Sequence, residues 1–214
     1  MILATKLYFM MKFVIGALFP SMLFTLFRTT RSTGTTSTDD IGNPTCPGSP
    51  SWQHAKCSMI TIFPKGTTCN LVQTEITSRI LGVNGWTDPH NHGTYTLLNQ
   101  VENQEENMTQ ITGSRLTGDG KYTDIFIFTL EDSPTNENGC ILRGCSESQV
   151  FSVLDFSTNY CNLRSLYCNN DVDGCPIVKE NFTYEETYVA CRQNDASQCF
   201  TSDLTIGDSD EEIR

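Results

Sequence analysis

The chain has 214 residues, ten of which are cysteines, and its apolar and aromatic content is typical of a globular protein. Four of its 14 basic residues precede position 32 and none of its 25 acidic residues precedes Asp39, so the chain after the N-terminal segment has a net charge of −15. Such an acidic body repels phosphate backbones, which argues against nucleic acid as a partner, and the composition excludes disorder of the whole chain.

An apolar segment begins the chain. From Phe13 to Phe27 it is flanked by basic residues, as the h-region of a secretory signal peptide is. No small-x-small cleavage site follows it, and the apolar run from Leu7 to Phe27 is interrupted only by a lysine and a proline. An uncleaved signal-anchor, which would place the protein at a membrane with type II topology, is therefore the alternative for 1–28. Both interpretations place the rest of the chain in the secretory lumen or outside the cell.

Residues 29–51 are rich in serine, threonine, glycine and proline, which predicts a linker. We expect one disulfide-rich domain over 52–200 and a disordered acidic tail over 201–214. The domain begins with a short apolar run from Met59 to Phe63, which predicts a strand that ends at Pro64.

A helix is predicted after this strand. Thr67 or Thr68 can cap its N-terminus, and Gly82 lies where a helix is expected to end. Its apolar positions recur at three- and four-residue steps and share one face: Cys69, Val72, Ile76 and Ile80. On that inward face, Cys69 is suited to link the helix to the sheet by a disulfide bond.

The segment after the helix, "GWTDPHNHGTYTLL", holds two of the three histidines. On an extended chain Asp88, His90 and His92 would share a face, and two imidazoles with a carboxylate can bind zinc or another divalent ion. Pro89 and Gly93 instead favour a turn that leads into a strand at residue 94. The two hypotheses are a metal site and a polar corner between helix and sheet.

Strands dominate the middle of the chain. "GTYTLLNQ" predicts one, and a polar loop, "VENQEENMT", follows it. The segment 110–132 predicts a hairpin with its turn at Asp119-Gly120. Its second strand alternates, with Asp124, Phe126 and Phe128 on one face, and its apolar centre predicts a central position in the sheet. Residues 140–156 predict one strand or two, with a bulge at Gly144.

The cysteines predict a disulfide framework of up to five bridges, whose pairing the sequence leaves open. No C-x-x-C spacing is present, which argues against zinc knuckles. Two sequons, at Asn107 and Asn181, predict N-glycosylation. The ten cysteines are Cys46, Cys57, Cys69, Cys140, Cys145, Cys161, Cys168, Cys175, Cys191 and Cys199.

The cysteine-rich part from Ser157 to Cys199 predicts loops and short strands. Within it, "NNDVDGCPIVKE" partly matches an EF-hand calcium loop, with oxygen ligands at the first, third, fifth and twelfth positions. These candidate ligands are Asn169, Asp171, Asp173 and Glu180. Pro176 lacks the backbone N–H that this loop uses, and no amphipathic helix flanks the segment. The alternative is an acidic turn bounded by disulfides.

The predicted fold is therefore an α+β domain, with one helix packed on an antiparallel sheet and a disulfide-stapled C-terminal lobe. A cystatin-like or NTF2-like roll has the same element order. Together, "GWTDPHNHGTYTLL", "SRLTGDGKYTD" and "GCSESQVFSVLDFSTNYCNLRSLYC" resemble a group of small secreted cysteine-rich proteins predicted from microalgal genomes. The resemblance covers Cys69 to Cys175 and implies no activity or ligand. Asparagine stands in that group where this chain has His92, which argues against a general metal role.

Neither a G-x-S-x-G nor an H-E-x-x-H motif is present in the sequence. We therefore expect a secreted or surface-anchored binding or structural domain for an unknown extracellular ligand, without catalysis and without a cofactor. The alternatives are a secreted metal-dependent hydrolase or metal-binding protein that uses Asp88, His90 and His92, and a calcium-stabilised extracellular module.

Overall fold

The computed structural model describes residues 45–48, 51, 53–105, 107–152 and 154–200. The segment 1–28, the acidic tail and most of the predicted linker lie outside these residues. Within the described part, no helix is long and apolar enough to cross a membrane.

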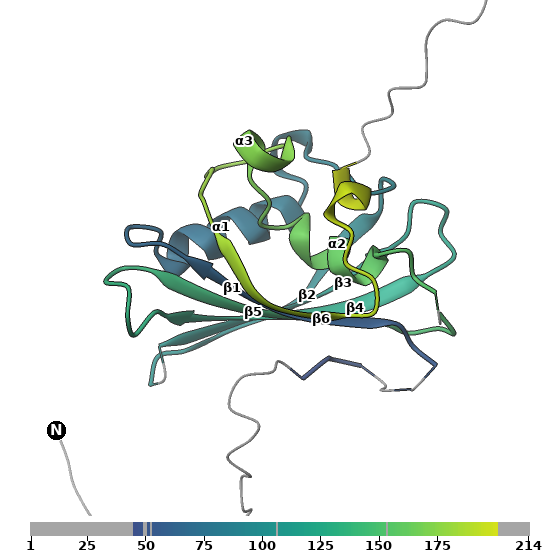
Figure 1. Ribbon diagram of the computed structural model, residues 1–214, viewed down its shortest axis with the longest axis horizontal. Helices are drawn as coiled ribbons and strands as arrows, with labels where there is room; N and C mark the ends of the chain where they lie inside the picture. Colours follow the sequence, from purple (N-terminus) through teal and green to yellow (C-terminus); the bar gives the residue numbers. More distant parts are fainter. Residues whose placement is uncertain (1–44, 49–50, 52, 106, 153, 201–214) are drawn as a thin grey trace, which may run out of the picture. The chain divides into compact units, whose positions relative to one another are not determined.

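A six-stranded antiparallel sheet in the order β2-β3-β4-β5-β1-β6 carries the helices on one face (Figure 1). The strands are β1 (Lys56–Phe63), β2 (Thr94–Asn103), β3 (Met108–Leu116), β4 (Thr123–Asp132), β5 (Cys140–Ser148) and β6 (Glu185–Cys191). The helices are α1 (Cys69–Ile80), α2 (Thr158–Arg164) and α3 (Asn170–Asp173), with 3₁₀ turns η1 (Val83–Gly85) and η2 (Ala196–Phe200). The predicted α+β class is confirmed.

Helix α1 is confirmed in detail. The Thr68 side chain caps it by accepting a hydrogen bond from the N–H of Leu71, and Gly82 follows it with a left-handed φ of 63°. The apolar face is buried against the sheet, and Cys69 is bonded to Cys140 on β5. The helix is therefore attached to the sheet both by packing and by a covalent bond.

The predicted hairpin and its alternation are also confirmed. Strands β3 and β4 pair without a shift, and Gly120 in the turn has a φ of 70°. On β4, Asp124, Phe126, Phe128 and Leu130 are buried toward the helices, whereas the residues between them are only half-buried. Strand β4 lies between β3 and β5, so its predicted central position is correct.

Three local predictions need correction. Strand β1 begins at Lys56 rather than at Met59, and the segment predicted as a polar loop is mostly the end of β2 and the start of β3. Gly144 is not a bulge, because β5 keeps its register to both neighbours there. A Cβ at that position would lie 2.8 Å from Cε1 of Phe128, so the glycine leaves room for the ring.

The C-terminal part is more regular than the predicted loops and short strands. It contains α2 and α3 and returns to the sheet as β6, which pairs with β1. All ten cysteines are bonded, which confirms the disulfide framework. The pairs are Cys46–Cys145, Cys57–Cys191, Cys69–Cys140, Cys161–Cys199 and Cys168–Cys175. The first of these bonds attaches the end of the predicted linker to β5.

Candidate functional site

The segment around Asp88 forms a corner between α1 and β2. The Asp88 carboxylate accepts hydrogen bonds from the backbone N–H of His90 (3.1 Å) and of Gly93 (2.9 Å). It also forms an ion pair with Arg115 on β3, whose Nε lies 3.1 Å from Oδ2. Neither side chain of this pair has exposed surface. Nη2 of Arg115 also donates to Oδ2, so the Asp88 oxygens have four donors, which leaves them poorly placed to bind a metal.

The two histidines of the corner do not share a role. His90 is buried, and its Nδ1 lies 2.6 Å from the carbonyl oxygen of Gln198. Burial lowers the pKa of His90 and thus favours the neutral imidazole, which donates through Nδ1–H to that carbonyl. His92 is exposed and has a left-handed φ of 55°. The structure thus does not bring Asp88, His90 and His92 together as ligands.

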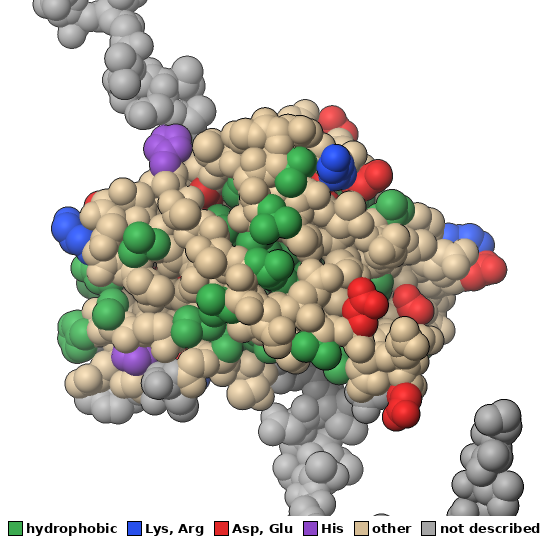
Figure 2. All heavy atoms as spheres, turned by 180° about the vertical axis from the view of Figure 1, so that it is seen from behind, with side chains coloured by type: hydrophobic (Ala, Val, Ile, Leu, Met, Phe, Trp, Pro, Cys, Tyr) green, Lys and Arg blue, Asp and Glu red, His purple; other side chains and the backbone are tan. Residues whose placement is uncertain are grey.

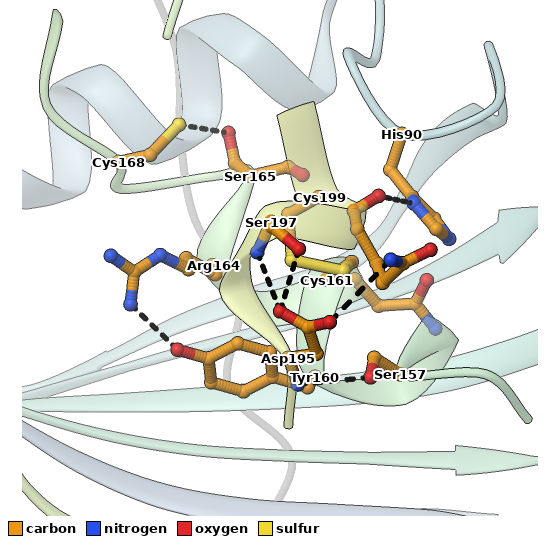
Figure 3. The surroundings of a disulfide bond; sticks show 12 residues. His90, Ser157, Tyr160, Cys161, Arg164, Ser165, Cys168, Asp195, Ser197 and Cys199 are labelled. Atoms are coloured by element: carbon orange, nitrogen blue, oxygen red, sulfur yellow. Dashed lines mark hydrogen bonds between the residues drawn. A yellow bond between two sulfur atoms is a disulfide. The ribbon is translucent and has the colours of Figure 1, made fainter. Parts of the chain in front are cut away.

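A disulfide bond holds the His90 contact in place. Cys161 of α2 is bonded to Cys199 of η2, and this bond keeps η2 next to α2 and the Gln198 carbonyl in reach of His90 (Figure 3). Just before η2, Asp195 accepts hydrogen bonds from the N–H and hydroxyl of Ser197. His90 therefore fastens the corner to the C-terminal turn, which is a structural role.

Two of the four candidate calcium ligands, Asn169 and Asp173, have their side chains occupied by contacts within the fold. Asn169 caps α3 through its side-chain oxygen, which accepts from two backbone N–H groups. Asp173 pairs with Arg164 (2.8 Å) and accepts a hydrogen bond from the Tyr184 hydroxyl (2.6 Å). Asp171 instead accepts a hydrogen bond from the side chain of Asn181, and Glu180 donates its backbone N–H to Glu75. The segment is a helical turn rather than an open calcium loop.

Among the described residues, no group of three or more histidines, cysteines, aspartates or glutamates is placed to hold a metal ion. The sequon residues Asn107 and Asn181 are both exposed, as glycan acceptors must be. Glycosylation at these positions stays a prediction.

A second buried ion pair was not foreseen from the sequence. Glu75 and Arg79 on α1 have no exposed side-chain surface and lie 2.7 Å apart. Glu75 also accepts the backbone N–H groups of Val178, Lys179 and Glu180, and Arg79 donates to the carbonyls of Ser165 and Cys168. The pair connects α1 to the C-terminal segment and is structural.

The most promising site lies at the end of the sheet where β4 begins and β5 ends. The loop residues 149–152 and 154–157 cover this end, next to the β3–β4 hairpin turn at the right of Figure 1. Between them is a cavity of about 110 Å³. Its lining residues are Thr117, Tyr122, Asp124, Ser148, Ser152, Leu154, Asp155, Phe156 and Thr158. The pocket therefore combines hydroxyls and two carboxylates with three large apolar side chains.

A polar network supports one wall of this pocket. Asn162 of α2 donates through Nδ2 to Asp124 Oδ2 (2.7 Å) and to the hydroxyl of Ser146 (3.1 Å). Ser146 donates to Asn159 Oδ1 (2.7 Å), and Asn159 donates through Nδ2 to Ser148 and to Asp155. These side chains are therefore held in fixed positions, as a binding site requires.

The sequence contains one signal for this site, the carboxylate in the alternating pattern of β4. The alternation of β4 placed Asp124 on the same face as Phe126 and Phe128, and an inward carboxylate in a strand needs a partner. Its partner, Asn162, is 38 residues away, so the sequence did not indicate it.

A larger groove of about 320 Å³ lies between the end of α1 and the Asp88 corner. Leu81, Trp86, His92 and Tyr95 are among its lining residues, but the Trp86 ring N–H donates to the carbonyl of Pro176 and Tyr95 donates to that of Asn162. Hydrophobic side chains also form a band across the face shown in Figure 2. Because the ring N–H of Trp86 and the hydroxyl of Tyr95 already have partners, the groove is a weaker candidate than the pocket beside Asp124.

Comparisons with known proteins do not assign the site. No family model, curated protein or solved structure matches the chain. The fold is an α+β domain with five disulfides, and the likeness to cystatin-like or NTF2-like rolls stays a prediction.

Proposed function

We propose that this protein is a secreted or surface-anchored binding domain that holds a small ligand in the pocket beside Asp124, without catalysis. The observation that carries the proposal is the rim of the pocket. There Tyr122, Leu154 and Phe156 are 43%, 65% and 69% exposed, although each has a large apolar side chain. Grouped exposed apolar side chains beside a cavity mark binding sites.

The disulfide bonds support a binding role. The loop 149–157 lies between Cys145 on β5 and Cys161 on α2, and these two cysteines are bonded to Cys46 and Cys199. A pocket whose walls are covalently restrained loses little conformational entropy when a ligand binds. The described lining residues include serine and threonine hydroxyls but no histidine to activate one of them as a nucleophile, which favours binding over catalysis.

The secreted location is part of the proposal and is supported by the ten bonded cysteines, which are typical of oxidising compartments. Membership of the microalgal cysteine-rich group is likewise proposed on the sequence resemblance alone. Expression in a eukaryotic host tests the location. Secretion of a product that lacks the apolar segment and loses mass on N-glycan removal supports it, and retention of an unglycosylated intact chain in the cytosol contradicts it.

Titration with benzyl alcohol, monitored by amide chemical shifts of the ¹⁵N-labelled protein, tests the pocket. We expect shifts concentrated at residues 117–124 and 148–158, and we expect them to be lost in the Leu154→Ser/Phe156→Ser variant. Val150→Ser/Phe151→Ser is the matched control, because these side chains are exposed on the same loop but do not line the cavity. Shifts that are absent, or that respond equally to both variants, would contradict the proposal.

A further inference from the structure

The chemistry of the ligand depends on Asp124. This side chain lines the pocket but is only 1% exposed. Its Oδ2 accepts a hydrogen bond from Asn162, whereas its Oδ1 has no hydrogen-bond partner in the described part of the chain. The side-chain oxygen of Asn162 is a second buried acceptor without a partner there. Buried acceptors without donors are destabilising, so the site is suited to a ligand that donates hydrogen bonds.

The charge around the pocket also favours a ligand that donates hydrogen bonds. Arg115 faces Asp124 across the β3–β4 pair but donates hydrogen bonds to the corner, where its guanidinium contacts Asp88, the carbonyl of His90 and the side chain of Asn91. One guanidinium thus lies near two buried carboxylates, those of Asp88 and Asp124. Asp155 is the second carboxylate of the pocket wall, so Asp88, Asp124 and Asp155 give three negative charges against the single guanidinium of Arg115. The local charge is therefore negative, which favours a cation.

We propose that the pocket binds an organic ammonium ion that carries an aromatic or aliphatic group, an inference that rests on the proposed function above. An ammonium is compact, donates three hydrogen bonds and suits a cavity of about 110 Å³ with a carboxylate in its wall. The apolar part of the ligand then lies against Tyr122, Leu154 and Phe156 at the rim. Calcium is less well suited, because it needs six to eight oxygen ligands, whereas two carboxylates line this pocket.

Benzylamine and benzyl alcohol form a matched pair of probes, since they differ mainly in the charged group. We expect benzylamine to bind at least about tenfold more tightly at pH 7 and low salt, because a hydrogen bond to a charged group is the stronger kind. Asp124→Asn keeps an oxygen that can accept from Asn162 but removes the charge, so it should abolish the preference for the amine. Asp132→Asn, an equal change of charge at the exposed far end of β4, should leave the preference unchanged.

The two proposals fail in different ways. If benzyl alcohol binds at the pocket and benzylamine binds no more tightly, the ammonium inference is wrong and the binding pocket stands. If neither probe shifts the pocket amides, the proposed function itself is wrong. If Asp124→Asn fails to fold, competition by sodium chloride in the unchanged protein replaces it: weakening of benzylamine alone supports the inference, and equal affinities at all salt concentrations overturn it.

Discussion

Arg115 on β3 and Asp88 in the α1–β2 corner form an ion pair that is fully withdrawn from solvent. The Arg115 guanidinium also donates to the carbonyl of His90 (2.6 Å) and to Asn91 Oδ1 (2.7 Å), so one side chain holds three of the four corner residues from 88 to 91. Gly93 makes room for it, since a Cβ there would lie 2.5 Å from the guanidinium carbon. The histidine-containing segment is thus shaped by an arginine on a neighbouring hairpin.

Removal of the arginine should be costly. Arg115→Met leaves Asp88 buried without a countercharge, and breaking a buried pair in this way lowers the free energy of unfolding by about 3–5 kcal/mol. Urea unfolding followed by circular dichroism measures the loss. Lys65→Met is the control, because Lys65 and Glu137 form an exposed pair, which contributes little to stability. Equal effects of the two variants would refute a special role for the buried pair.

The buried pair of Glu75 and Arg79 should make the protein less stable in acid. Burial raises the pKa of Glu75, but hydrogen bonds from the N–H groups of Val178 and Glu180 and the charge of Arg79 outweigh it and lower the pKa below its ordinary value of 4.5. The stabilisation by ionised Glu75 is therefore complete above pH 4.5 and is lost as the pH falls through the lower folded-state pKa.

We expect Glu75→Gln to lower the free energy of unfolding at pH 7 and to flatten its dependence on pH below 4.5. Urea unfolding between pH 3 and pH 7 measures both effects. Glu137→Gln, at a largely exposed position, should leave the dependence of the free energy of unfolding on pH as it is in the unaltered protein. A slope that persists in Glu75→Gln would show that other carboxyl groups cause the acid sensitivity.

Zinc should not stabilise the protein through the corner. The Asp88 carboxylate accepts hydrogen bonds from His90, Gly93 and Arg115, which it would have to lose to bind zinc, and the described residues include no group of three possible metal ligands. Calorimetric melts with equimolar zinc and with EDTA should give the same Tm. A rise with zinc that disappears in the His90→Asn/His92→Asn variant would revive the metal hypothesis.

The disulfide bonds should differ in their contribution to stability. Cys69 and Cys140 are 71 residues apart in sequence, whereas Cys168 and Cys175 are seven apart. In the loop-entropy model, removal of the first pair by Cys69→Ser/Cys140→Ser costs about 4 kcal/mol, and removal of the second costs about 2 kcal/mol. Urea unfolding of the two double variants tests the order, and a greater loss from Cys168→Ser/Cys175→Ser would contradict it.

The elements that follow a local period were predictable. Helix α1 has apolar residues at three- and four-residue steps, a threonine before it and a glycine after it, and β4 alternates through Phe126 and Phe128. Each of these signals lies within about a dozen residues of chain. The extra length of β1 and the loss of the expected bulge at Gly144 depend instead on neighbouring strands, and they were missed.

The sequence by itself determined the α+β class, the position and inward face of α1, the β3–β4 hairpin and the oxidised state of the cysteines. Only the tertiary structure decided which cysteines pair and that Asp88 forms an ion pair with Arg115. It also decided that Asp124 lies in the wall of a pocket, where its Oδ1 has no hydrogen-bond partner among the described residues. The physical reason is distance along the chain. Arg115 is 27 residues from Asp88, and the backbone donors of Glu75 are more than 100 residues away, so no local pattern indicates these contacts.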